Sequence, residues 1–202
     1  MTAERTRGQV RRLCVFSGSS PGISPAYGAA ARRLGEQLAL GGIDLVYGGA
    51  SVGLMGAVAD AVLARGGRVT GVIPQALVER EVAHPGLTDL RIVASMHERK
   101  ALMAELSDGF IALPGGIGTL EELLEIWTWA QLGSHIKPCA VLNVSGFYEG
   151  LLRFLDHIAG QGFLKPVHRD MLIVEDDPAM LLRAMAQYCA PVASKWIGPA
   201  QR

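Results

Sequence analysis

The sequence predicts a single α/β domain built on a parallel β-sheet with helices on both faces. Three observations predict this fold: a length of 202 residues, a hydrophobic content of 50%, and short β-rich runs that alternate with longer helical periods. The length is about one and a third times that of a typical domain, and the apolar content is too high for a disordered chain. Such alternation is typical of a parallel sheet with crossover helices.

Seven strands and six helices are expected, and proline and glycine mark several of their ends. The helix at 25–40 begins with Pro25, which suits a first helical turn, and Gly41 follows it as a C-cap. The apolar face of the helix at 53–65 ends at Gly66. The expected strands are 13–17, 44–47, 69–73, 91–94, 109–113, 139–143 and 172–175; the other helices are 96–107, 119–132, 148–161 and 178–189; residues 1–11 and 191–202 are expected to be loosely held tails.

Charge and cysteine usage exclude several classes of protein. Nineteen basic and nineteen acidic residues give a net charge of zero with no basic stripe, so we expect no nucleic-acid partner. No stretch approaches the roughly 18 apolar residues of a membrane helix, and no leader is recognisable, so a cytoplasmic protein with no membrane partner is expected. Cys14, Cys139 and Cys189 are far apart, which argues for small core residues and against a disulfide framework or a zinc site.

Three glycine-containing loops follow expected strands. They are S-G-S-S-P-G at 17–22, G-G-A-S-V-G at 48–53 and P-G-G-I-G-T at 114–119. Because the carboxyl ends of parallel strands share one edge of the sheet, the three loops predict one cleft. Glycine lets backbone N–H groups approach a ligand, and a helix N-terminus behind the loop adds partial positive charge. A phosphate group is therefore the expected ligand.

Common phosphate and metal motifs are incomplete. The third loop lacks the final glycine of G-x-G-x-x-G, because Glu121 stands there, so a dinucleotide site is weakly supported. The second loop has Leu54 where a P-loop needs lysine, which argues against hydrolysis of nucleoside triphosphates. The pair His97–Glu98 is followed by Ala101 where H-E-x-x-H needs histidine, and we expect no metal.

The helix expected at 119–132 separates apolar from acidic side chains. One arc is predicted to lie in the core, and the opposite arc faces water or a site. Glu125 is interpreted as the ordinary preference for acidic residues near a helix N-terminus. Glu121 and Glu122 lie within one turn of the proposed phosphate-binding N–H groups, where a carboxylate can stabilise positive charge on a sugar or take a proton from water. The apolar arc comprises Leu120, Leu123, Leu124 and Trp127, and the acidic arc comprises the three glutamates and Thr128.

A cation lies on the apolar face of the helix expected at 96–107. Ser95 and Glu98 have the spacing of a capping box, so Glu98 is interpreted as structural. Arg99 falls in the middle of the apolar face, and Lys100 lies at its edge. An unpaired guanidinium there would cost several kcal/mol, so we expect Arg99 to meet a carboxylate or a phosphate, with snorkelling to solvent as the alternative. That face comprises Met96, Leu102, Met103 and Leu106.

Two segments resemble a known family. The stretches S-M-H-E-R-K at 95–100 and P-G-G-I-G-T-L-E-E at 114–122 resemble the Lonely Guy family of cytokinin riboside 5′-monophosphate phosphoribohydrolases. The resemblance extends over about 13–164 and includes the complete motif P-G-G-x-G-T-x-x-E. It implies a doubly wound, Rossmann-like fold and a homodimer. It also implies hydrolysis of the N-glycosidic bond of an adenine-type nucleoside 5′-monophosphate to free base and ribose 5-phosphate, with no metal or organic cofactor.

Carried over position by position, the resemblance implies roles for individual side chains. Arg99 and Glu122 would be catalytic, with Glu122 fixed by Arg99 and stabilising an oxocarbenium-like transition state or activating the attacking water. N–H groups at 116–119 would hold the 5′-phosphate, and Glu121 the ribose hydroxyls. Glu79 stands where many members of the family have proline, so the geometry of the loop around Glu81 stays open. Substrate contacts are expected for Ser20, Gly49, Glu81, Met96, Lys100, Gly115, Gly116, Ile117, Gly118, Thr119, Glu121 and Thr128.

One alternative function is rejected from the sequence, and two questions about function stay open. A decarboxylase, a label that members of this family have carried, would need a lysine for pyridoxal phosphate; only Lys100 is expected near the cleft, so we reject it. A nucleotide-binding sensor without turnover is the alternative function. The choice between AMP and N6-prenylated AMP depends on the volume of the base pocket, which a sequence does not give.

Overall fold

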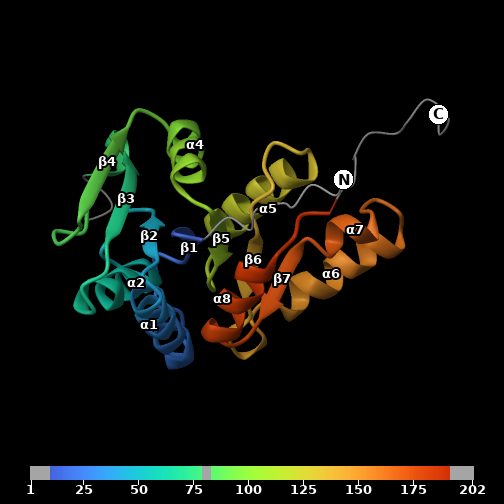
Figure 1. Cartoon of the computed structure of the whole chain (residues 1–202), viewed down its shortest axis with the longest axis horizontal. Helices are drawn as coiled ribbons and strands as arrows, with labels where there is room; N and C mark the ends of the chain where they lie inside the picture. Colours follow the sequence, from blue (N-terminus) through green and yellow to red (C-terminus); the bar gives the residue numbers. More distant parts are fainter. Residues whose placement is uncertain (1–9, 79–82, 192–202) are drawn as a thin grey trace, which may run out of the picture.

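The computed structural model, which describes residues 10–78 and 83–191, contains a seven-stranded, entirely parallel sheet (Figure 1). The strand order is β4-β3-β2-β1-β5-β6-β7. All seven expected strands are present, which confirms the predicted fold class. Their bounds are β1 Arg12–Phe16, β2 Asp44–Tyr47, β3 Val69–Pro74, β4 Asp89–Val93, β5 Gly109–Ala112, β6 Cys139–Leu142 and β7 Leu172–Glu175.

Helices cover both faces of the sheet, and successive side chains of a strand face opposite layers. On β1, Leu13 and Val15 join one hydrophobic cluster, whereas Cys14 and Phe16 join the other. The first cluster contains side chains of α1 (Pro25–Leu40), α2 (Gly53–Ala64) and α8 (Pro178–Gln187). The second contains those of α4 (Met96–Leu106), α5 (Ile117–Gln131) and α6 (Glu149–Gly160), so the sheet is doubly wound (Figure 1).

Three short helices were not predicted from the sequence. They are α3 (Gln75–Val78), the 3₁₀ turn η1 (Val144–Gly146) and α7 (Pro166–Arg169), each too short to show a helical period. The expected start of α5 at 119 was wrong by two residues, because the helix begins inside the glycine loop at Ile117. Residues 1–9 and 192–202, which make up most of the two expected tails, lie outside the described residues.

Three predictions about burial were wrong. Leu124 is 38% exposed, and Ile126 takes its place in the core, so the buried arc of α5 is rotated from the predicted one. Met96 is also exposed, because it lies in the first turn of α4 beside a pocket. Cys189 is exposed, whereas Cys14 and Cys139 are core residues as expected. Within 10–78 and 83–191, no helix is both long and apolar enough to span a membrane.

Candidate active site

The three glycine loops meet at the carboxyl edge of the sheet, as expected. Gly18 N–H donates to Pro114 O at 3.1 Å, and Leu54 N–H donates to Gly18 O at 3.0 Å, so the first loop is tied to the other two. Ser17, Gly48 and Gly116, one from each loop, line a single cavity of about 260 Å³. The cavity lies beside β1, where the strand order reverses direction, which is where parallel α/β sheets commonly bind ligands.

The N-terminus of α5 forms one end of this cavity. The first helical hydrogen bond runs from Leu120 N–H to Gly116 O at 3.2 Å, so the helix leaves the N–H groups before Leu120 for a ligand or water. Gly116 is the N-cap and offers no capping side chain. A Cβ on Gly115 would lie 2.1 Å from Thr119 Oγ1. Glycine at 115 is therefore what allows the buried Thr119 hydroxyl to stand at this helix end.

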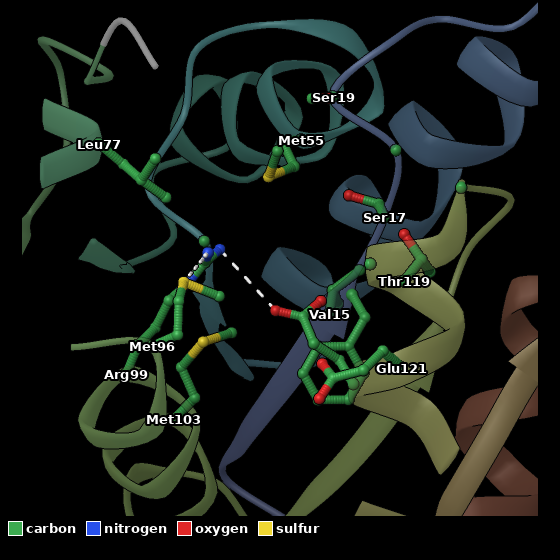
Figure 2. Close-up of a pocket in the computed structure, with 16 residues that line it drawn as sticks. Val15, Ser17, Ser19, Met55, Leu77, Met96, Arg99, Met103, Thr119 and Glu121 are labelled. Carbon is green, nitrogen blue, oxygen red and sulfur yellow. Dashed lines mark hydrogen bonds and ion pairs between the residues drawn. The ribbon is translucent and has the colours of Figure 1, made fainter. Parts of the chain in front are cut away.

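Arg99 of α4 and Glu122 of α5 form a buried ion pair in the wall of the cavity, which Figure 2 marks with a dashed line. Arg99 Nη2 lies 3.9 Å from Glu122 Oε1, and the two side chains are only 7% and 11% exposed. The sequence-based expectation of an anionic partner for Arg99 is met by this carboxylate. Arg99 Nη1 also points to the Met96 sulfur at 3.7 Å. A pair held this far from water is electrostatically stronger than a surface pair.

Gly48 provides the space for the Arg99 guanidinium. A Cβ at position 48 would lie 2.2 Å from Arg99 Nη2 and 3.0 Å from the Met55 sulfur. Heavy atoms do not approach that closely without displacement, so any side chain at 48 would push the guanidinium away. Sequence reasoning placed Gly48 in a phosphate-binding loop and missed this function.

Lys100 is held by two carboxylates of α5. Its Nζ lies 2.5 Å from Glu121 Oε1 and 2.9 Å from Glu125 Oε2. Burial lowers the pKa of Lys100, but the hydrogen bonds and charges of the two glutamates outweigh it, so the pKa is raised. The interpretation of Glu125 as a mere N-terminal preference was wrong, because its carboxylate joins α5 to α4.

The cavity has a polar end and an apolar end, with the ion pair between them (Figure 2). The hydroxyls of Ser17 and Thr119 lie at one end, and the side chain of Leu77 lies at the other, with Met55 along the wall. Met96 and Met103 add further apolar surface beside Arg99.

The structure brings seven of the predicted site residues into the cavity wall and leaves the others outside it. The wall includes Met96, Arg99, Gly116, Gly118, Thr119, Glu121 and Glu122. Ile117 is 82% exposed at the start of α5, Thr128 donates to Leu124 O one turn back, and Gly49 packs against Ile73. Ser20, Gly115 and Lys100 are close neighbours that do not line the wall. Glu81 lies outside the described residues.

Nine residues of the cavity wall were not among the predicted site residues. Position in the first two glycine loops could have indicated Ser17, Gly18, Ser19 and Gly48. Nothing in the sequence marks the other five, because apolar side chains of a cavity resemble core residues: Val15, Phe16, Met55, Leu77 and Met103.

The floor of the site is the core of β1. Burial raises the pKa of the Cys14 thiol well above its usual value; the nearby Glu122 carboxylate raises it further, and the Arg99 guanidinium lowers it. The Cys14 thiol is therefore uncharged at neutral pH and lies next to the ion pair. In the described part of the chain, no group of three or more His, Cys, Asp or Glu side chains is arranged to hold a metal ion.

Comparison with solved structures supports the fold. The molybdenum cofactor carrier protein of Chlamydomonas reinhardtii superposes with a TM-score of 0.66 at 20% identity, covering 88% of this chain and 96% of that one. The molybdenum cofactor binding protein of Rippkaea orientalis superposes with a TM-score of 0.63 at 18% identity, covering 86% and 93%. At these identities the likeness concerns the fold alone.

Comparison of sequences is more specific. Cytokinin riboside 5′-monophosphate phosphoribohydrolase LOG7 of Arabidopsis thaliana is 50% identical over 92% of this chain and 85% of its own length. The probable enzyme of the same description, LOGL5, from Oryza sativa subsp. japonica is 52% identical over 92% of this chain and 76% of its own length. A family model described as "Possible lysine decarboxylase" matches residues 55–185. Because that match spans well over half of the chain and these relatives align along nearly all of it, the chain belongs to this family, the Lonely Guy family.

Proposed function

We propose that this protein hydrolyses the N-glycosidic bond of adenine-type nucleoside 5′-monophosphates and releases the free base and ribose 5-phosphate. The observation that carries the proposal is the buried pair of Arg99 and Glu122, placed between a helix N-terminus and an apolar wall. The printed names of the relatives, which are phosphoribohydrolases, support the same reaction.

The 5′-phosphate binds at the N-terminus of α5. The N–H groups at 117–119 and the Thr119 hydroxyl are donors, and the helix dipole favours negative charge there. Gly116 and Gly118 have no atom within 4 Å of an added Cβ, so open space surrounds them for a bulky anion. The phosphate thereby fixes the position of the sugar.

The ribose then lies against Glu122. As the bond from C1′ to the base nitrogen breaks, positive charge develops on the sugar, and the carboxylate stabilises it. The electron pair goes to the base, which takes up a proton, while the attacking water bonds to C1′ and gives up a proton to Glu122. Arg99 positions the carboxylate, and Glu121, held by Lys100, binds ribose hydroxyls.

The base binds at the apolar end of the cavity. Leu77, Met55 and Met96 offer apolar surface, and methionine adapts to ligands of different shape. This surface suits both adenine and adenine with an N6-prenyl group. We propose that one or both of these nucleotides are substrates.

The residues present do not fit pyridoxal phosphate, the usual cofactor of amino-acid decarboxylases. That cofactor needs a lysine with a deprotonated amine in the site. Lys100 is bonded to two carboxylates that raise its pKa. Lys137 does not line the cavity, and its Nζ donates a hydrogen bond of 2.7 Å to Ala104 O. Among the described residues, no lysine lines the cavity wall.

The test is release of base from purified protein. With AMP and with isopentenyladenosine monophosphate, we expect chromatography to show free base from at least one nucleotide. Glu122→Gln should lower the rate about a hundredfold or more. Glu105→Gln, the same change at an exposed carboxylate of α4, should not alter it. Tight binding of either nucleotide without release of base would overturn the proposal and favour a sensor.

We also propose that the protein is a cytoplasmic homodimer. The resemblance to the family supports the dimer, and the free, buried thiols of Cys14 and Cys139 suit a reducing compartment. Sedimentation equilibrium should give twice the chain mass of 21.5 kDa. Fractionation of cells should recover the protein with other cytoplasmic proteins.

A further inference from the structure

Ser17 carries a buried hydroxyl for which the described part of the chain offers no hydrogen-bond partner. The residue is 7% exposed and lines the cavity, so its Oγ faces the space where a ligand binds. Buried hydroxyls are normally bonded, because an unmade hydrogen bond is costly. A group that is left unpaired beside a cavity is suited to a bound molecule.

The loop that carries Ser17 is fixed against the start of α5. Gly18 N–H donates to Pro114 O at 3.1 Å, and a Cβ on Gly18 would lie 3.3 Å from Gly115 Cα. The first and third glycine loops therefore touch backbone to backbone. This contact places Ser17 at the same end of the cavity as Thr119, and Figure 2 shows both hydroxyls at that end.

The charges at this end favour an anion. The N-terminus of α5 supplies N–H donors and partial positive charge, whereas the Glu122 carboxylate is paired with the Arg99 guanidinium. A phosphate held by the N–H groups of α5 still has oxygens that are free to accept from the neighbouring first loop. Ser17 belongs to that loop, and a hydroxyl can donate to such an oxygen.

We propose that the Ser17 hydroxyl is a ligand of the substrate's phosphate and binds it from the first glycine loop, beside the α5 N-terminus. This inference rests on the proposed function, and it adds a binding residue that belongs to the first loop of the sheet. It also explains why a polar atom is kept buried there: the cost of the unpaired hydroxyl in the free protein is recovered when phosphate binds.

The experiment compares Ser17→Ala with Ser107→Ala. Ser107 is a matched control, because its hydroxyl is equally buried and also lacks a partner among the described residues, but it lies outside the cavity. Dissociation constants for ribose 5-phosphate and for adenine are measured by calorimetry. We expect Ser17→Ala to weaken ribose 5-phosphate about tenfold or more and to leave adenine unchanged. Ser107→Ala should change neither constant.

The outcomes separate this inference from the proposed function. Equal affinity of wild type and Ser17→Ala for ribose 5-phosphate would overturn the role of Ser17, as would equal weakening of both ligands. Failure of wild type to bind ribose 5-phosphate would overturn it too. Release of base from AMP by wild type is measured separately and decides the proposed function alone. Thermal unfolding checks folding: removal of an unpaired hydroxyl should leave the midpoint of both variants unchanged or raised.

Discussion

Individual residues decide whether the ion pair of the site can form. The guanidinium of Arg99 occupies the space that Gly48 leaves open, and the Glu122 carboxylate lies 3.9 Å from it. Because both side chains are buried, each charge is stabilised mainly by the other, and removing one would leave the other charge poorly solvated. Two predictions follow from this dependence.

Gly48→Ala is expected to lower the rate of base release at least tenfold. The new Cβ would lie 2.2 Å from Arg99 Nη2 and would displace the guanidinium from Glu122. Steady-state assays with AMP check this. Gly150→Ala is the matched control, because an added Cβ there has no atom within 4 Å, and its activity should equal that of wild type. Full activity of Gly48→Ala would contradict the geometry.

Arg99→Met is expected to lower kcat about a hundredfold. The side chain keeps much of its volume, but the Glu122 carboxylate loses the charge that positions it. Arg99→Lys should recover part of the rate, because it keeps the charge without the fork of the guanidinium. Measured kcat values for the three proteins check this order. An unchanged rate in Arg99→Met would remove Arg99 from the mechanism.

At the scale of elements, α4 and α5 are joined by Lys100 with Glu121 and Glu125. Because hydrogen bonds and charge raise the pKa of Lys100 in the folded protein, the contribution of this cluster to stability is present below the ordinary lysine value of 10.5. It is lost as the pH rises through the raised, folded-state pKa. The cluster therefore holds the two helices together at neutral pH.

Lys100→Met is expected to lower the free energy of unfolding at pH 7 to 9. The difference from wild type should shrink as the pH rises above 10.5, where the lysine of the unfolded chain loses its proton, and it should vanish above the raised folded-state pKa. Urea unfolding at several pH values measures it. A difference that stays constant into strongly alkaline solution would show that lost packing, rather than charge, is responsible.

The sequence predicts elements better than it predicts how they rotate against each other. The apolar runs of the sequence predict all seven strands, and the cost of burying a guanidinium predicts an anionic partner for Arg99. The exposure of Leu124 and the pairing of Glu125 depend on the rotation of α5 against its neighbours. No local pattern contains that rotation, and a four-residue helix such as α7 shows no period at all.

At the scale of the whole molecule, the site lies where the two halves of the sheet join. β1 pairs with β2 on one side and with β5 on the other, and the loops after these three strands form the cavity. We therefore expect a bound phosphate compound to touch loops from both halves, so that its binding energy is shared among segments far apart in the sequence.

Ribose 5-phosphate is expected to stabilise the whole molecule and to protect three loops at once. At one hundred times its dissociation constant it should raise the free energy of unfolding by about 2.7 kcal/mol. Hydrogen exchange followed by mass spectrometry should show slower exchange in 17–22, 48–53 and 114–119. Protection confined to 114–119 would show that the other two loops do not take part.

The pairing of β1 with β5 also bears on how the protein gains activity as it folds. Leu13 pairs with Gly109, so the two walls of the cavity meet only after a long stretch of chain has closed into place. Contacts of this kind form slowly compared with local ones. During renaturation, the ability to release base should therefore appear later than the helical signal in circular dichroism. Recovery of enzymatic turnover would then report the last step of folding.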